Sequence, residues 1–154
     1  MNNNTNASRE SYRQMKDRHQ AEINALPIAF AFSRDQYARQ LDSWGITEAE
    51  AEAGAIVSIG GGFIRASDRD LVTSAFNRIA EEKAAAIAAD HDGTGFIYQM
   101  FFDELNNHEY IYTRDIDETL DALNITNNDL AENKALLSGL NLAVKKICTS
   151  TGDI

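Results

Sequence analysis

Apolar residues recur with the period of an α-helix along most of the chain, which predicts a mainly helical fold. Between residues 10 and 26 they fall on one face of a helix that Pro27 should end. A longer helix is predicted over residues 67–90, where apolar side chains line one side: Val72, Phe76, Ile79 and Ile87. Residues 96–105 are apolar nearly all round, so we expect this segment to be the buried central helix.

Residues that cap backbone N–H groups stand where the predicted helices begin: Ser33, Thr47, Ser67, Asp115 and Thr126. Gln36 and Glu50 follow the first two at the spacing of a capping box. Gly45 occupies the place of a left-handed helix end. The helix that begins after Thr126 is expected to be the last, with one apolar side: Leu130, Leu137, Leu140, Val144 and Ile147.

Three segments depart from the helical pattern. Residues 55–59 and 63–65 read as two short strands joined by the turn Gly60-Gly-Gly62. Residues 109–113 alternate like a strand and would pair with that hairpin, whereas residues 28–32 are either a strand or a buried connector. The pattern therefore predicts a mainly α fold with a small β element (α+β), as one compact domain over residues 9–154 behind a disordered polar tail at residues 1–8.

Length and composition fit one cytoplasmic domain. The chain has 154 residues, 44% of them hydrophobic, and contains no run of 18 apolar residues that would span a membrane. The sequence MNNNTNASRE has neither the basic nor the apolar region of a secretory signal. Cys148 is the single cysteine, so no disulfide forms within the chain.

Negative charge is concentrated in the middle of the chain. The formal net charge is −10, and residues 42–132 hold five Lys/Arg against nineteen Asp/Glu, while both flanking segments are mildly basic. Such a field repels nucleic acid and membrane surfaces and attracts basic partners. A solvated surface that only keeps the protein soluble would have the same composition.

The glycine run Gly60-Gly-Gly62 is a candidate phosphate site, because glycines let backbone N–H groups approach an anion. It has neither the Gly-Lys-Ser/Thr of a P-loop nor the spacing of a dinucleotide site, and no lysine is near. A tight hairpin turn is therefore the better interpretation.

Two polar segments have partial metal-site patterns. Asp90 and Asp92 precede Gly93 as in part of a calcium loop, but the first and last carboxylates of that loop are missing, and a helix-ending turn explains the same residues. Glu104 and His108 have the i, i+4 spacing of metal ligands, but no second histidine completes the set. A polar helix end with His108 at its C-terminus is the alternative interpretation.

His19 and Cys148 are the remaining candidates for chemistry. His19 lies on an apolar stripe and is expected to be a packed side chain. Cys148 has no histidine beside it in sequence to act as a base, so we expect a buried, unreactive thiol.

Four short segments carry a resemblance to known proteins: Phe30-Ala-Phe-Ser33 with Gln36, Gly60-Gly-Gly-Phe63, Glu104-Leu-Asn-Asn-His-Glu-Tyr110 and Thr119-Leu-Asp-Ala-Leu123. From about residue 28 onward the chain resembles short acidic proteins of phages and mobile elements of gut and related bacteria. That group has no assigned activity, so no catalytic residue is transferred. The resemblance implies a context, because small acidic proteins of that origin often bind and block a host protein, such as a nuclease of a defence system.

Three functional hypotheses follow. The first is a non-enzymatic protein-binding module, without cofactor or metal, that covers a basic, nucleic-acid-binding surface of a host protein. Its expected binding residues form two acidic segments: Glu48, Glu50 and Glu52, and Asp115, Asp117, Glu118 and Asp121. The second is a small metal-dependent, hydrolase-like enzyme that uses Asp90, Asp92, Glu104 and His108. The third is a self-assembling structural accessory protein, with an interface from the apolar segment near Phe101.

Overall fold

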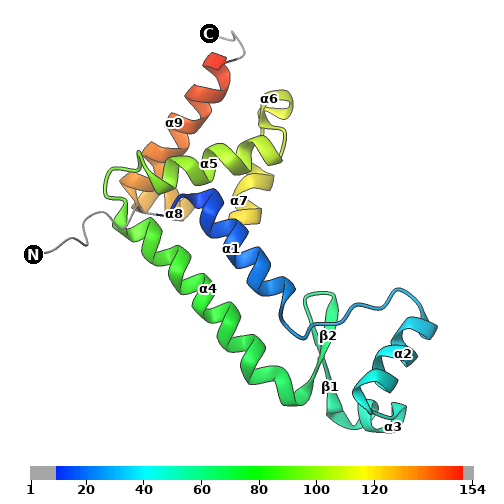
Figure 1. Ribbon diagram of the computed structural model, residues 1–154. Helices are drawn as coiled ribbons and strands as arrows, with labels where there is room; N and C mark the ends of the chain where they lie inside the picture. The colour runs from blue at the N-terminus through cyan, green and yellow to red at the C-terminus, as the bar shows by residue number, and fades with distance from the viewer. Residues whose placement is uncertain (1–9, 151–154) are drawn as a thin grey trace, which may run out of the picture. The chain divides into compact units, whose positions relative to one another are not determined.

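The computed structural model describes residues 10–150, and most of them are helical (Figure 1). The α-helices are α1 (Tyr12–Asn24), α2 (Arg34–Trp44), α3 (Glu48–Glu50), α4 (Arg69–Ala89), α5 (Phe96–Asn107), α6 (Tyr110–Thr113), α7 (Asp117–Leu123), α8 (Asn127–Glu132) and α9 (Lys134–Ser150). The strands β1 (Ile56–Ile59) and β2 (Gly62–Arg65) form an antiparallel hairpin. The predicted mainly α fold with a small β element is confirmed. The predicted tail at residues 1–8 lies outside the described residues.

The chain divides into two compact units. Unit 2 comprises His19–Glu81, and unit 1 comprises the chain before and after it, up to Arg18 and from Glu82. The division falls within α1 and α4, so both helices contribute residues to both units. That residues 9–154 fold as one domain stays a prediction.

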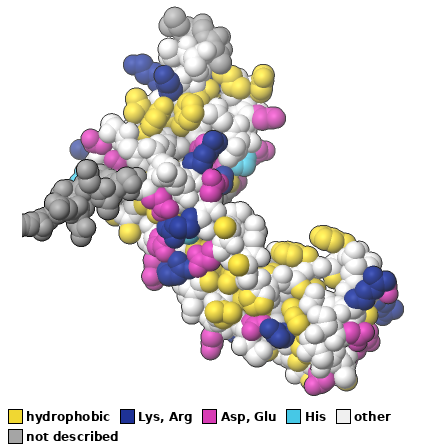
Figure 2. All heavy atoms as spheres, viewed as in Figure 1, with side chains coloured by type: hydrophobic (Ala, Val, Ile, Leu, Met, Phe, Trp, Pro, Cys, Tyr) yellow, Lys and Arg dark blue, Asp and Glu magenta, His cyan; other side chains and the backbone are white. Residues whose placement is uncertain are grey.

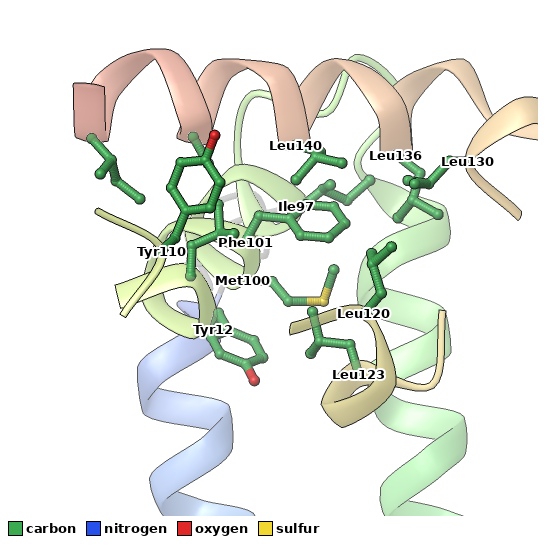
Figure 3. Close-up of a cluster of buried hydrophobic side chains, with 13 residues drawn as sticks. Tyr12, Ile97, Met100, Phe101, Tyr110, Leu120, Leu123, Leu130, Leu136 and Leu140 are labelled. Atoms are coloured by element: carbon green, nitrogen blue, oxygen red, sulfur yellow. The ribbon is translucent and has the colours of Figure 1, made fainter. Parts of the chain in front are cut away.

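The core of unit 1 is built around α5. Ile97, Met100, Phe101 and Leu105 are fully buried, because α5 is covered on several sides, as its nearly all-round apolar sequence predicts. Figure 3 shows leucines of α9 above the α5 side chains that it labels and leucines of α7 beside and below them. These partners are Leu136, Leu140, Leu120 and Leu123.

Two glycines let α9 approach α5 and the turn before it. A Cβ added to Gly139 would lie 2.4 Å from Cγ2 of Ile97 and 2.8 Å from the carbonyl oxygen of Gly93. Gly93 has φ +79°, and a Cβ there would lie 2.0 Å from the Ala135 carbonyl oxygen. Only glycine fits these two positions without displacing the backbone.

Two predictions for the C-terminal half are wrong. Residues 109–113 form the helical turn α6 and not a strand, because left-handed backbone at Glu109 (φ 56°) and Arg114 (φ 57°) bounds a turn that buries Tyr110. The helix expected after Thr126 is two helices, α8 and α9. Extended backbone at Asn133 separates them, and its side-chain oxygen accepts a hydrogen bond from the Leu136 N–H at 3.1 Å.

Two helices of unit 2, α2 and α3, begin at predicted N-cap residues. The Ser33 hydroxyl accepts a hydrogen bond from the Gln36 backbone N–H at 3.1 Å, and Gly45 ends α2 with φ 69°. Thr47 and Glu50 form the complete capping box of α3. The third expected cap is wrong, because Ser67 lies inside a 3-10 turn (Ala66–Asp68) that leads into α4.

The hairpin of unit 2 confirms the predicted glycine turn. Gly60 (φ 51°) and Gly61 (φ 83°) form its two-residue loop, in which positive φ at both positions matches the twist of the strands. Phe63 of β2 is buried edge-on against the rings of Tyr37 and Trp44, at centroid distances of 5.2 and 5.6 Å. Residues 28–32 are a connector with one strand-like bridge, from Ala29 to Phe63.

Within residues 10–150, no helix combines the length and the apolar character needed to cross a membrane.

The glycine packing makes a first prediction. Gly139→Ala should lower the free energy of unfolding by about 2 kcal/mol, because the added methyl group forces α9 away from Ile97. Chemical denaturation followed by circular dichroism measures this change. The neighbouring exposed position gives the control, and Ser138→Ala should stay within about 0.5 kcal/mol of the wild type. A Gly139→Ala protein as stable as the control would contradict the packing.

Candidate functional site

Glu104 is the one acidic side chain among residues 10–150 that is buried. Its carboxylate accepts hydrogen bonds from the Tyr12 hydroxyl, from Nζ of Lys16 at 3.0 and 3.1 Å, and from Nδ2 of Asn107 at 2.9 Å. Tyr12 and Lys16 come from α1, whereas Glu104 and Asn107 lie on α5. We call these four residues the Glu104 network. It joins segments about ninety positions apart in sequence, as the separation of 92 between Tyr12 and Glu104 shows.

The pKa values of the network follow from burial and hydrogen bonding. Burial alone would raise the pKa of Glu104, but hydrogen bonds from Tyr12, Asn107 and Lys16 outweigh burial and hold this pKa below its usual value. Burial, and then the hydrogen bond to Glu104, raise the pKa of the Tyr12 phenol. Glu104 is therefore an anion at neutral pH and Tyr12 remains protonated, so neither is tuned to exchange a proton there.

Lys83 of α4 stands near this network. Burial lowers its pKa, the negative charge of Glu104 opposes that shift, and the positive charge of Lys16 adds to it. Two lysines thus face one buried carboxylate. The arrangement is a charge-compensated structural cluster, since the carboxylate already has four hydrogen bonds from three donors.

Asp90 and Asp92 stabilise the turn before α5. Oδ2 of Asp90 accepts hydrogen bonds from the N–H groups of Gly95 at 3.1 Å and Ile97 at 2.9 Å. Oδ1 of Asp92 accepts from the N–H and the hydroxyl of Thr94 at 3.0 and 2.7 Å, and these bonds lower the pKa of Asp92. Both carboxylates therefore have the turn-forming contacts that the alternative interpretation predicts.

Glu104 and His108 do not share a site, despite their spacing. His108 ends α5, and its Nδ1 lies 3.8 Å from Oε2 of Glu118, while the Glu104 carboxylate points into its own network. No group of three His, Cys, Asp or Glu side chains within residues 10–150 is arranged to hold a metal ion. His19 is buried, as predicted, and Cys148 is half-buried, with a hydrogen bond from the Arg114 guanidinium at 2.8 Å.

A pocket of about 370 Å³ opens in unit 1 beside the turn that Asp90 stabilises. Its apolar wall comes from three helices through Met15, Ala86, Ala89 and Phe96, and Glu10, Asp90, Gly95 and Gln99 complete the lining. The polar groups at this pocket already have partners: Glu10 is paired with Arg18 at 2.8 Å, and Oε1 of Gln99 accepts from the Tyr12 N–H at 3.0 Å. The pocket offers space for an apolar group but no converging reactive side chains.

The predicted binding residues are all exposed, in two places. Asp115, Asp117, Glu118 and Asp121 lie at and on α7, whose opposite face buries Thr119, Leu120 and Leu123. Glu48, Glu50 and Glu52 belong to unit 2, on α3 and the turn after it. Figure 2 shows acidic side chains on both units.

Two of these residues also have local structural contacts. Oδ1 of Asp115 accepts a hydrogen bond from the Asp117 N–H at 2.9 Å. Oε1 of Glu50 accepts one from the Thr47 N–H at 3.0 Å, and this bond contributes most to lowering the pKa of Glu50. The prediction that Asp115 caps the helix after it is wrong, because the N-cap position of α7 is Ile116, which has no side-chain cap, and the Asp115 carboxylate stabilises the turn before the helix.

Comparison with known proteins assigns a family. A model of the family of unknown function DUF7659 matches residues 11–146. The chain belongs to DUF7659. No curated protein and no solved structure matches it. The DUF7659 match includes the whole Glu104 network and both acidic segments.

Sequence reasoning missed the role of Glu104 in this DUF7659 protein. Its main partners, Tyr12 and Lys16, lie on α1, and no local pattern shows that α1 packs against α5. One signal was available: an acidic residue inside the nearly all-round apolar segment 96–105 must be paired if that segment is buried.

The network makes a second prediction, on stability and pH. Tyr12→Phe removes one donor to a buried carboxylate and should lower the free energy of unfolding by about 1.5 kcal/mol at neutral pH. The pKa of Glu104 is depressed in the folded state. Its contribution to stability is therefore complete above the unfolded value of about 4.3 and is lost as the pH falls through the folded pKa.

Urea denaturation of both proteins at a series of pH values measures this effect. The difference between wild type and Tyr12→Phe should shrink as the pH falls below about 4.3. Tyr98→Phe, on α5, is the matched control and should change stability by less than about 0.5 kcal/mol. A difference that stays constant down to the lowest pH at which the proteins fold would exclude Glu104 as its source.

Proposed function

We propose that this protein is a non-enzymatic binding module that docks on a basic surface of a partner protein through the acidic residues at α7. One observation carries the proposal: Asp115, Asp117, Glu118 and Asp121 are all exposed within seven positions, Asp115 just before α7 and the other three on this helix, whose other face is buried in the core. We call these four residues the α7 acidic face.

The physical case rests on repulsion within this face. Asp117 and Asp121 are one helical turn apart, and like charges at i, i+4 destabilise a helix by a few tenths of a kcal/mol. Nδ1 of His108 lies 3.8 Å from Oε2 of Glu118, and this pair is charged only when the imidazole is protonated. Lysines and arginines of a partner would relieve this repulsion and would speed association through long-range attraction.

Glu48, Glu50 and Glu52 give unit 2 a second acidic segment that would meet the same kind of surface. Since Glu50 is engaged in the Thr47 capping box, its contribution to docking is the smaller one. The α7 acidic face therefore comes first in any test.

The kind of partner that we propose rests on the resemblance of the sequence to short acidic proteins of phages and mobile elements. A protein of that origin would bind a host protein, and a basic surface that normally holds nucleic acid would suit the α7 acidic face. A nuclease of a defence system is one such host protein. Binding would act by steering and then occlusion, in the cytoplasm, without direct contact with nucleic acid or membrane.

No observation favours the metal-dependent enzyme as a second function. Asp90 and Asp92 stabilise a turn, Glu104 belongs to a buried network and His108 pairs with Glu118. A stoichiometric metal ion in the purified protein would support the hypothesis of a metal-dependent enzyme.

A capture experiment makes the third prediction. Wild-type protein is used as bait in host lysate beside the variant Asp115→Asn, Asp117→Asn, Glu118→Gln, Asp121→Asn, which removes four charges and leaves α7 its hydrogen-bonding groups. Mass spectrometry should find a basic protein enriched by the wild type and depleted at least about tenfold by the variant, since losing several contacts to a charged partner costs over 1.4 kcal/mol. The affinity of the purified pair should fall steadily with added salt.

A variant of equal charge is the control. Asp42→Asn, Asp70→Asn, Glu81→Gln, Glu132→Gln removes four exposed charges elsewhere, so both variants have a formal net charge of −6 instead of −10. The control should capture the partner like the wild type. Equal loss with both variants would assign the effect to total charge, and an affinity that ignores salt would rule out electrostatic docking.

A further inference from the structure

The pocket beside the turn that Asp90 stabilises has room for a small molecule. Its volume is about 370 Å³, and ligand-binding clefts in proteins begin at roughly 300 Å³. The start of α1, the end of α4, the turn after α4 and the start of α5 all line it, and these segments belong to unit 1. Figure 1 shows the turn between α4 and α5 near the start of α1. The pocket therefore lies within one compact unit.

The wall of this pocket is apolar and held in place by packing. Ala86 and Ala89 stand three positions apart on α4, so they lie on one side of that helix and fill little space. Met15 of α1 is buried, and the Phe96 ring packs edge-on against Tyr12 at a centroid distance of 5.6 Å. An apolar molecule that covers this wall gains the free energy of removing apolar surface from water.

Acidic side chains complete the lining. The carboxylate of Asp90 has a fixed place, because it accepts hydrogen bonds from the N–H groups of Gly95 at 3.1 Å and Ile97 at 2.9 Å. Glu10 supplies the second carboxylate. None of the lining residues within residues 10–150 is a lysine, an arginine or a histidine. The lining therefore offers negative charge beside an apolar wall.

The charges around the pocket keep its field negative. Arg18 pairs with Glu10 at 2.8 Å, but it also pairs with Glu82 at 2.7 Å, so one cation is shared by two carboxylates. Asp92, two positions after Asp90, adds a further negative charge. This field repels an anionic ligand and attracts a cationic one.

We propose that this pocket binds a small organic cation, with an apolar body and one ammonium group. The body would lie against Ala86 and Phe96, and the ammonium group would donate a hydrogen bond to the carboxylate of Asp90. Oε1 of Gln99 accepts the Tyr12 N–H at 3.0 Å and has a second lone pair for the same ammonium group. The residues that line the pocket do not include those of the α7 acidic face, so this binding is separate from the docking of a basic protein.

Three probes with the same ring and different end groups test the ligand class: 2-phenylethylamine, 2-phenylethanol and phenylacetate. Binding is followed by NMR of the full chain with labelled methyl groups on alanine and methionine. The methyl resonances of Met15, Ala86 and Ala89 should shift with the amine, and those of Ala122 and Ala131, on α7 and α8, should not. The dissociation constant should be about 1 mM or lower for the amine and at least about tenfold higher for phenylacetate, with phenylethanol between them.

Two pairs of variants locate the site. Ala89→Phe fills the pocket and should weaken amine binding at least about tenfold, whereas Ala88→Phe, exposed on α4 outside the lining, should not. Asp90→Asn removes one charge, keeps an acceptor for the turn and should weaken amine binding about threefold without changing phenylethanol binding. Asp17→Asn, at an exposed carboxylate of α1, is its control and should bind the amine like the wild type. Circular dichroism verifies that each variant is folded.

The comparison of the three probes uses the wild type, so it decides the proposal even if a variant fails to fold. Equal affinity for the amine and for phenylacetate overturns the proposal, as does the absence of shifts at the pocket methyl groups with about 10 mM amine. Equal loss of amine binding in Ala89→Phe and Ala88→Phe would overturn it as well.

Discussion

The free energy needed to remove a carboxylate from water determines which acidic side chains of this protein are buried and which stay exposed. Among residues 10–150, Glu104 is the acidic side chain that is buried, and it is stable there because Tyr12, Lys16 and Asn107 satisfy its oxygens. The pairing fixes α1 against α5 within unit 1. The carboxylates that have no comparable partners remain at the surface, where they determine the field that a partner encounters.

The core determines which face of α7 is exposed. α5 is covered by α9, which Gly139 allows to approach closely, and by the apolar face of α7. Thr119 reinforces that packing through a hydrogen bond to the Glu104 carbonyl oxygen at 3.4 Å. Because one face of this short helix is fixed in the core, its acidic residues have no position other than the outer face. A rigid charged face loses less conformational entropy on binding than a flexible one.

Local chemistry made much of the fold predictable from the sequence. Ser33, Thr47 and Thr126 act as caps, the glycines at 60 and 61 form the hairpin loop, and the apolar segment 96–105 is the central helix. The failures have tertiary causes. Residues 109–113 alternate like a strand but form a helical turn, because left-handed backbone bounds the turn and Tyr110 is buried in the core. The Glu104 network depends on a helix about ninety positions away. The spacing of Glu104 and His108 suggested one site because sequence alone does not show that the two side chains diverge.

Carboxylate footprinting tests the central claim, which is that Glu104 is structural and the α7 acidic face binds. A carbodiimide and an amine modify exposed carboxylates, and mass spectrometry locates the products in the free protein and in its complex with the captured partner. In the free protein Glu104 should stay unmodified while Asp115, Asp117, Glu118 and Asp121 react, and the partner should protect these four. Modification of Glu104 in the native protein, or a complex in which the four react as they do in the free chain, would contradict the account.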